Sequence, residues 1–276
     1  MTADTTAPFG AYRLKPWRAG LLSFAQAMPV NWSGRRGALY ARKLALLKGP
    51  AVVDAEVDGL NLRLYMNDNV SERKFLFMPQ FFDPFERALL KKELKNGGVF
   101  VDVGANAGVY SLTAAALVGE QGKVVSIEPN PAVLERLVFN ARLNGFEKRV
   151  VTVQVAVSDN EGIFTLTLDD TNLGGSSLVS ERSAHVLSVP CQKLLAVVEQ
   201  QGLSKIDAIK ADIEGAEDMA LVPFFKDAPP ALHPRLLIVE NSVSGWKQDL
   251  PAALKAAGYT LLKQTRMNLV YTKAGA

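Results

Sequence analysis

The protein has 276 residues and a mass of 29.9 kDa, which allows one large α/β domain with an extension or two small domains. Apolar residues make up 48% and charged residues 21%, so disorder over most of the chain is excluded, because there is ample side chain to bury. A single cysteine and two histidines exclude an internal disulfide and a zinc site built from these residue types.

The net charge of +3 is unevenly distributed along the chain. Residues 1–50 contain eight bases and one acid, for a net charge of +7, whereas the other 226 residues contain 23 bases and 27 acids. This asymmetry favours a peripheral contact of residues 1–50 with a membrane or another anionic surface, and a solvated basic flank explains it equally well. No stretch reaches the roughly 18 apolar residues of a membrane span, so we expect a cytoplasmic protein, with membrane association left open.

Residues 1–50 are expected to form a basic N-terminal arm and helix, and residues 51–276 the main domain. Prolines interrupt residues 1–33, which favours an arm, and residues 34–48 predict a helix. Residues 51–66 alternate around Asp58-Gly59, which predicts a β-hairpin. A lead-in helix over 84–95 completes the segment 51–98, and the catalytic core is expected over 99–276.

From residue 99 onward, Val- and Ile-rich strands alternate with helical patterns, which predicts an α/β fold with a mostly parallel sheet and helices on both faces. The segment 163–190 interrupts the alternation and predicts two strands around a Gly/Ser loop, where substrate contacts are expected. The expected strands are 99–103, 123–127, 150–157, 206–211, 235–239, 259–262 and 268–272, and the expected helices are 107–118, 131–144, one from 215, and 247–257.

The strongest local signal is the turn after the strand at 99–103. Its glycines, Gly104 and Gly108, permit close approach of the backbone to a ligand, and the following helix directs N–H groups at the same place. The spacing differs from the G-x-G-x-x-G pattern of dinucleotide sites, and Asp102 precedes it. A ligand with cationic groups and no phosphate, such as S-adenosylmethionine, therefore fits better than a nicotinamide dinucleotide.

The next strand ends in Glu128, 24 residues after Gly104 and near the roughly 20 expected for a ribose-binding acid. A carboxylate at this position can accept hydrogen bonds from both ribose hydroxyls. An acidic N-cap is the alternative explanation for Glu128, and we favour ribose binding. Val157, after the third strand, is expected beside the adenine ring.

Three charged residues alternate at the end of the fourth strand: Lys210, Asp212 and Glu214. If the strand end is extended, the three side chains share one side of it. Unpaired charges there destabilise the fold, so we expect them to pair with one another, bind a ligand or take part in catalysis. Asp212 is the first candidate for a general base, with Lys210, Glu214 and Glu240 as reserves. A metal held by Asp212 and Glu240 is an alternative means of activating a hydroxyl.

Three blocks of sequence resemble the hallmark motifs of the FkbM-type S-adenosylmethionine-dependent methyltransferases: 101–108, 128–131 and 210–217. The resemblance covers about residues 80–272. It implies a class I methyltransferase sheet, Rossmann-like, with an antiparallel strand near its edge, and O-methylation of a hydroxyl on a sugar, glycan or natural product. The residues expected to bind S-adenosyl-L-methionine are Asp102, Gly104, Ala105, Asn106, Gly108, Glu128, Pro129, Asn130 and Val157.

Two other functions are weighed against this one. A nicotinamide-dependent oxidoreductase on the same kind of sheet is disfavoured by the missing dinucleotide motif. A non-catalytic S-adenosylmethionine-binding module is disfavoured by the charged residues at 210–214. A nucleic-acid partner is not expected, because no basic patch interleaved with aromatic residues is evident along the chain.

Overall fold

The computed structural model describes residues 3–168, 173 and 185–273. The predicted Gly/Ser loop lies outside these residues, apart from Leu173. No helix in the described ranges has the length and apolar character required to cross a bilayer.

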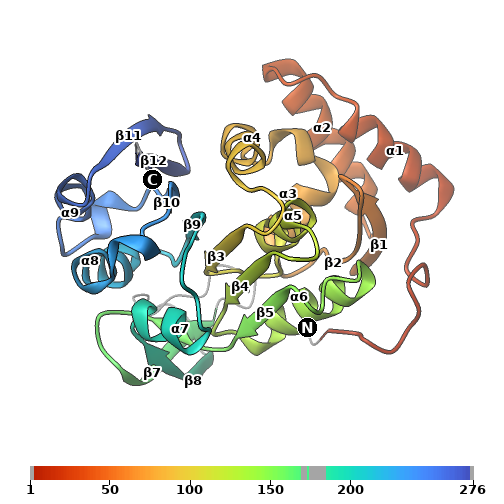
Figure 1. Cartoon of the computed structure of the whole chain (residues 1–276). Coiled ribbons are helices and arrows are strands. Elements are labelled where there is room, and N and C mark those ends of the chain that lie inside the picture. The colour runs from red at the N-terminus through yellow and green to blue at the C-terminus, as the bar shows by residue number, and fades with distance from the viewer. Residues whose placement is uncertain (1–2, 169–172, 174–184, 274–276) are drawn as a thin grey trace.

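The first part of the chain forms a helical hairpin, a β-hairpin and two further helices beside the main sheet (Figure 1). The β-hairpin agrees with the prediction: Val57 pairs with Leu60 across the turn, and Asp58 and Gly59 both have positive φ, as a type I′ turn requires. The elements are α1 (Pro16–Gln26), α2 (Trp32–Leu46), β1 (Val52–Val57), β2 (Leu60–Tyr65), α3 (Val70–Phe77), η1 (Pro79–Phe81) and α4 (Pro84–Glu93).

Residues 1–33 were expected to be an arm, and this expectation is wrong for the described residues. Pro16 begins helix α1, since proline suits the first helical turn, and Ala25 of that helix is fully buried. The segment before α1 is tied down by the buried guanidinium of Arg63, which donates to the carbonyl oxygens of Asp4, Ala7 and Pro8. An arm that supplies the hydrogen-bond acceptors of a buried arginine is part of the folded structure.

A seven-stranded sheet forms the centre of the molecule, in the order β11-β12-β10-β9-β3-β4-β5. Strand β12 runs antiparallel to both of its neighbours, and the pairs among β10, β9, β3, β4 and β5 are parallel, as the resemblance implies. The strands are β3 (Val99–Val103), β4 (Lys123–Ile127), β5 (Val150–Val153), β9 (Ala208–Ala211), β10 (Leu236–Glu240), β11 (Tyr259–Gln264) and β12 (Asn268–Lys273).

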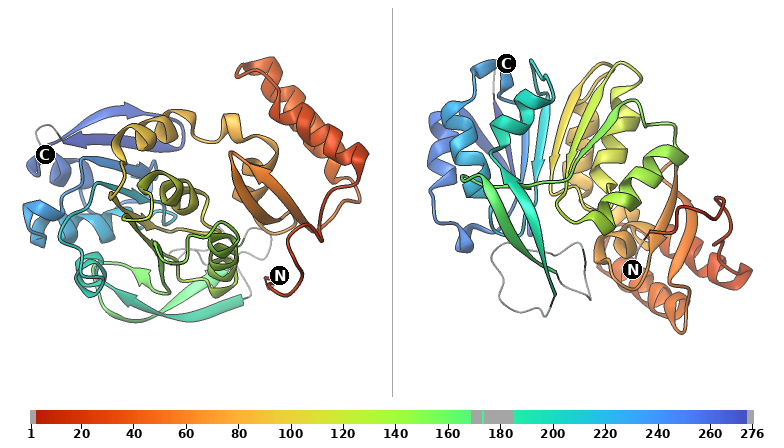
Figure 2. Two further views of the ribbon diagram at one scale, coloured as in Figure 1. Left: turned by 45° about the vertical axis from the view of Figure 1, so that its right-hand side comes forward. Right: turned by 90° about the horizontal axis from the view of Figure 1, so that it is seen from below.

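Helices cover both faces of this sheet (Figure 2). Successive strand residues face opposite sides, so Phe100 packs with α4, α5 and α6, and Val101 packs with α7, α8 and α9. The chain order reverses between β3 and β9, and ligands of open α/β sheets bind beyond the carboxyl ends of the strands at such a point. The covering helices are α5 (Val109–Val118), α6 (Pro131–Leu143), α7 (Leu194–Gln200), α8 (Glu217–Asp227) and α9 (Leu250–Ala256).

A small second sheet corrects the prediction of one strand over 150–157. The main-sheet strand β5 ends at Val153, and the chain then leaves the sheet, because β6 (Ala156–Val157) pairs instead with β8 (His185–Gln192). Strand β7 (Gly162–Leu168) completes this sheet as the antiparallel partner of β8. The break moves Val155 and Val157 to a cavity at the carboxyl edge of the main sheet.

Candidate active site

The turn after β3 requires glycine for a steric reason. Gly104 has φ +81°, and a Cβ atom there would lie 1.9 Å from the carbonyl oxygen of Asp212. The ends of β3 and β9 therefore lie closer together than any residue other than glycine at position 104 would permit. Gly108 was expected to face the ligand, but a Cβ at this position would collide with Leu137 of α6, and among the described residues it lines neither of the cavities below.

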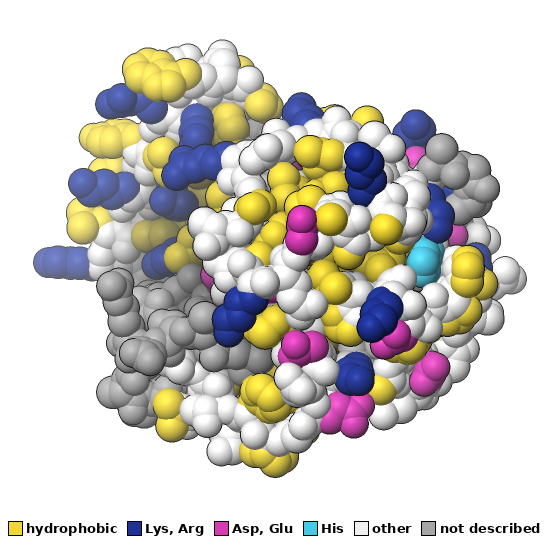
Figure 3. Space-filling model, turned by 90° about the vertical axis from the view of Figure 1, so that its left-hand side faces the viewer, with side chains coloured by type: hydrophobic (Ala, Val, Ile, Leu, Met, Phe, Trp, Pro, Cys, Tyr) yellow, Lys and Arg dark blue, Asp and Glu magenta, His cyan; other side chains and the backbone are white. Residues whose placement is uncertain are grey.

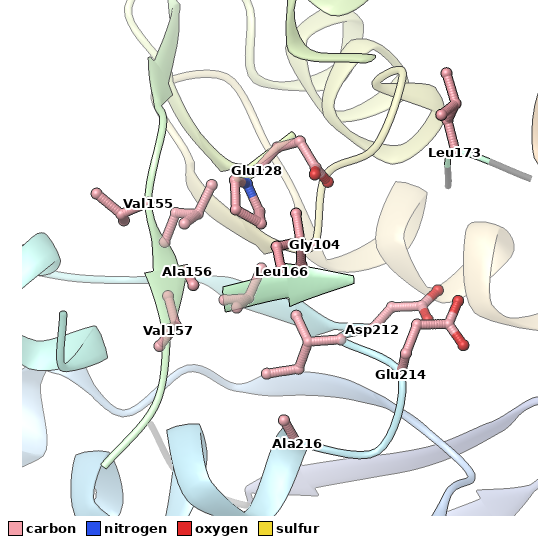
Figure 4. Close-up of a pocket in the computed structure, with 14 residues that line it drawn as sticks. Gly104, Glu128, Val155, Ala156, Val157, Leu166, Leu173, Asp212, Glu214 and Ala216 are labelled. Carbon is pink, nitrogen blue, oxygen red and sulfur yellow. The ribbon is translucent and has the colours of Figure 1, made fainter. Parts of the chain in front are cut away.

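The first cavity lies between the ends of β3, β4 and β9 and the small sheet. In Figure 4 the side chains of Val155 and Val157 border one side, and the carboxylates of Asp212 and Glu214 lie next to each other on another. Apolar walls with a few polar groups suit a nucleoside. The lining residues are Val103, Gly104, Ile127, Glu128, Pro129, Val155, Ala156, Val157, Leu166, Leu173, Asp212, Ile213, Glu214 and Ala216.

Glu128 lines this cavity and also holds two loops in place. Its Oε2 accepts the N–H of Asn106 and its Oε1 accepts the N–H of Asn130, each at 2.9 Å. Burial raises the pKa of Glu128 to about 7 against the opposing effect of these bonds. The side chain that caps α6 belongs to Asn130, which accepts from Ala132 N–H, so Glu128 is not the N-cap. Each carboxylate oxygen keeps a lone pair for a ribose hydroxyl.

The second cavity adjoins the first, since Gly104, Asp212 and Glu214 line both. It contains the predicted residues Asp102, Ala105, Asn106, Lys210 and Glu240. Side chains from α3, α5 and β12 complete it, and the sequence did not indicate them. These additional lining residues are Val70, Ser71, Lys74, Phe82, Asp83, Ala107, Val109, Tyr110, Met267 and Asn268.

Lys210 lies between two carboxylates. Its Nζ donates to Asp212 Oδ2 at 2.6 Å, and Asp102 is its register partner on β3. Burial acts to lower the pKa of Lys210, but the charges of Asp212 and Asp102 outweigh it and raise the pKa above its ordinary value. The side chain is therefore an ammonium, which argues against the reserve role of Lys210 as a general base.

Asp102 is committed to partners inside the protein. Its side chain is buried, and its Oδ2 accepts from Ser111 Oγ at 2.6 Å, while Ser126 Oγ donates to Ser111. Burial raises the pKa of Asp102, and Lys210 counteracts the shift. The geometry gives Asp102 the task of balancing Lys210 rather than that of a principal ligand contact.

The expected extended run through Asp212 and Glu214 does not form. Strand β9 ends at Ala211, and the chain then turns, with Glu214 in the left-handed region at φ +56°. The turn is fixed by Glu217, whose Oε1 accepts from the N–H groups of Ile213 and Gly215. Asp212 and Glu214 still lie at the same edge of the first cavity (Figure 4).

Glu240 contributes a perturbed carboxylate to the second cavity. Burial, followed by the negative charges of Asp212 and Glu214, raises the pKa of Glu240 to about 8. Its Oε2 is buried and has no hydrogen-bond partner among the described residues. Such an oxygen is costly unless a ligand or a proton satisfies it.

Asp83 and Tyr110 were missed by the sequence analysis, although Asp83-Pro84 marks the start of α4. Asp83 has φ +43°, its Oδ2 accepts from the hydroxyl of Tyr110 at 3.1 Å, and its Oδ1 lies 3.5 Å from Lys74 Nζ. Among the described residues, no three carboxylate, histidine or cysteine side chains are close enough together to hold a metal ion.

These residues fit S-adenosylmethionine. The first cavity offers apolar walls to an adenine ring and Glu128 to a ribose diol. The carboxylates of Asp212 and Glu214 extend into the second cavity, where they complement a ligand with an ammonium and a sulfonium charge.

The chain is similar to known methyltransferases. The methyltransferase FkbM domain matches residues 102–272. The methyltransferase sdnD of Sordaria araneosa is 26% identical over 252 residues, which cover 80% of this chain and 93% of that protein. Among solved structures, the METTL16 methyltransferase domain has a TM-score of 0.49 at 14% identity, with 93% of this chain and 91% of that chain covered. The fibrillarin of Aeropyrum pernix, with natively bound S-adenosyl-L-methionine, has a TM-score of 0.43 at 12% identity, with 68% and 74% covered. The chain belongs to the FkbM family of S-adenosylmethionine-dependent methyltransferases.

Proposed function

We propose that the enzyme methylates a hydroxyl oxygen of a sugar, glycan or natural-product acceptor. The observation that carries the proposal is the position of Asp212, whose carboxylate lines both cavities and is paired with the Lys210 ammonium at 2.6 Å. A base at the junction of a cofactor cavity and an acceptor cavity is where a hydroxyl proton must be removed during transfer.

The cofactor supplies an electrophilic methyl group on a sulfonium. The acceptor oxygen forms the new bond to the methyl carbon as the carbon–sulfur bond breaks, and the hydroxyl proton passes to the Asp212 carboxylate. Lys210 holds that carboxylate in one orientation, and the two adjoining cavities align the reacting atoms. Glu214 and Glu240 remain the alternative bases.

The lining of the second cavity supports an acceptor rich in hydroxyl groups. Ser71, Asn106, Asp83 and Asn268 provide hydrogen-bonding side chains there. After β9 the chain reads Ala211-Asp212-Ile213-Glu214 rather than the Asn/Asp-Pro-Pro-aromatic sequence associated with methylation of nucleobase amines. Both features favour oxygen over nitrogen as the methylated atom.

Incubation with methyl-labelled cofactor and a panel of sugar, glycan and polyketide acceptors tests the proposal, with mass spectrometry to locate the added methyl group. Asp212→Asn should lower kcat by about 10²–10⁴-fold and weaken the binding of S-adenosylhomocysteine, which lacks the sulfonium charge, by a much smaller factor. Glu199→Gln, an exposed carboxylate on α7, is the matched control. A methyl group on nitrogen or carbon would refute O-methylation, and full turnover by the Asp212 variant would remove it from the mechanism.

The same experiment separates the enzyme from a non-catalytic binding module. A module binds the cofactor and transfers no methyl group to any acceptor of the panel. The nicotinamide-dependent alternative loses its basis with the family assignment.

A further inference from the structure

Helix α2 fully buries only small side chains, and it exposes several of its large ones. Gly34, Ala38, Ala41 and Ala45 are the buried residues of the helix, and their spacing places them on one side. Small residues allow close packing, and a Cβ at Gly34 would clash with the carbonyl oxygen of Pro29. The side of α2 that packs on the protein is therefore centred on small residues, with Leu39 and Leu46 partly buried against the same core.

The opposite side of α2 alternates aromatic or aliphatic residues with basic ones. At helical spacing it presents Trp32, Arg36, Tyr40, Lys43 and Leu47, which ends the stripe at the C-cap. The three apolar members are 74%, 65% and 64% exposed. A helix whose only role is to cover a domain normally turns such residues inward.

Helix α1 continues this pattern, with Trp17 and Phe24 more than half exposed. Together with Trp32 and Tyr40 they are all the exposed large aromatic side chains in the described ranges. We refer to Trp17 and Phe24 of α1, together with the α2 stripe, as the outer face. Its clustering of large apolar side chains exceeds the scatter expected on an ordinary surface.

The segment is also strongly cationic without internal neutralisation. No Asp or Glu occurs between Asp4 and Asp54, and no ion pair among the described residues involves a base of α1 or α2. An anion is the complementary partner.

Figure 3 shows hydrophobic and basic side chains side by side on the lobe behind the main body, at the upper left, where acidic side chains are scarce. Two arginines of α1 and α2 cover aromatic rings: the guanidinium of Arg18 lies 4.5 Å from the centre of the Trp17 ring, and that of Arg36 lies 4.8 Å from the centre of the Trp32 ring. Indole rings flanked by arginines suit the boundary between water and an acyl region.

We propose that the outer face of the α1–α2 hairpin docks onto the surface of a membrane that contains anionic lipids. Basic side chains meet the headgroups, and the indole, phenyl and aliphatic side chains enter the boundary between headgroups and acyl chains. Nucleic acid fits this face less well than a membrane does. The face does interleave basic residues with aromatic ones, which the sequence analysis did not expect. The face is a convex helix surface rather than a groove, and Leu47 offers a base nothing to stack on.

Vesicle binding by the full chain tests the proposal, with phosphatidylcholine alone compared with an equal mixture of phosphatidylcholine and phosphatidylglycerol. The protein should co-sediment with the anionic vesicles only, and added salt should weaken binding. Arg36→Glu/Lys43→Glu should lower the partition coefficient by at least about tenfold. Lys91→Glu/Lys92→Glu, which reverses two exposed bases of α4, should leave it unchanged.

A second pair of variants tests the apolar contribution. Trp17→Ser/Trp32→Ser should lower binding by a similar factor, and Leu261→Ser/Leu262→Ser, at exposed sites on β11, should not. Tryptophan fluorescence provides an independent readout, since the emission maximum of Trp17 and Trp32 should move to shorter wavelength when the protein binds anionic vesicles. In the Trp17→Phe/Trp32→Phe variant, Trp246 is the remaining tryptophan, and its Nε1 donates to Glu217 inside the protein. The emission of this variant should not change on anionic vesicles. Circular dichroism confirms that each variant is folded.

Four outcomes would overturn the proposal. These are absence of binding to anionic vesicles, equal binding to neutral and anionic vesicles, and binding that the outer-face variants leave intact. The fourth is that the outer-face variants weaken binding to a different partner instead. That partner would be single-stranded RNA, if the protein binds it more tightly than vesicles, or a second copy of the chain, if the free protein self-associates.

Discussion

Two clusters of buried charge in this protein share a composition, one cation between two carboxylates, and differ in their surroundings. Arg136 of α6 contacts Asp68 at 2.9 Å and Glu72 at 2.7 Å, and its side chain is wholly buried. Lys210 lies between Asp102 and Asp212, and the side chain of Asp212 is 39% exposed to the cavity.

The comparison separates an architectural role from a chemical one. The Arg136 cluster joins α6 to α3 and the loop before it, and is closed to solvent. The Lys210 cluster opens on two cavities and has a further carboxylate beside it, Glu240, with a buried oxygen that lacks a partner among the described residues. A charge cluster indicates a reaction site when it is incomplete and faces a cavity.

Arg136→Ala should give the largest change in stability. It leaves Glu72 and Asp68 buried without their cation, so we expect a loss of about 3–5 kcal/mol in the free energy of unfolding, measured by urea denaturation. Arg142→Ala, an exposed arginine on the same helix, should change stability by less than about 0.5 kcal/mol. Equal effects of the two substitutions would show that the cluster is not architectural.

Glu128→Gln tests the opposite class of buried carboxylate, one that faces a cavity. The variant loses one charge-assisted acceptor, so the affinity for S-adenosylhomocysteine should fall about 10–100-fold in calorimetry, equivalent to about 1.5–3 kcal/mol. Glu135→Gln, on the exposed side of α6, is the control. Unchanged affinity would remove Glu128 from the cofactor site.

Glu240→Gln should change how stability depends on pH. The pKa of Glu240 is raised from 4.5 to about 8, so between these values the folded state binds more protons than the unfolded state, and this group lowers stability as pH rises. Relative to the wild type, the variant should therefore become more stable between pH 4.5 and about 8, as followed by urea unfolding at several pH values. Parallel profiles would show that Glu240 is not perturbed.

Asn31→Ala should have the smallest effect, because it removes a cap rather than a buried charge. The side chain of Asn31 accepts from Gly34 N–H at 2.8 Å at the start of α2, and its loss should cost about 1 kcal/mol, seen as a lower Tm. Ser23→Ala, exposed within α1, serves as the reference and should be nearly neutral. A larger loss for the Ser23 variant would contradict the assigned cap.

The local sequence determined the alternating strands and helices, the β-hairpin turn and the glycine turn that ends β3. Each of these depends on periodicity or on backbone geometry within a few residues, as in the positive φ angles of Asp58, Gly59 and Gly104. The predicted bounds of β3 and β4 agree with the structure for the same reason.

Only the tertiary structure decided which partner each of these residues meets. Gly108 is required by Leu137 of another helix, and β5 ends at Val153 because β6 pairs with β8, where Ala156 lies opposite Cys191. The inward and outward faces of α2 also depend on what packs against it, since its alanines lie against the protein and its tryptophan does not. Sequence periodicity shows that a helix has two faces, but the choice of the buried face depends on the shape of its neighbours.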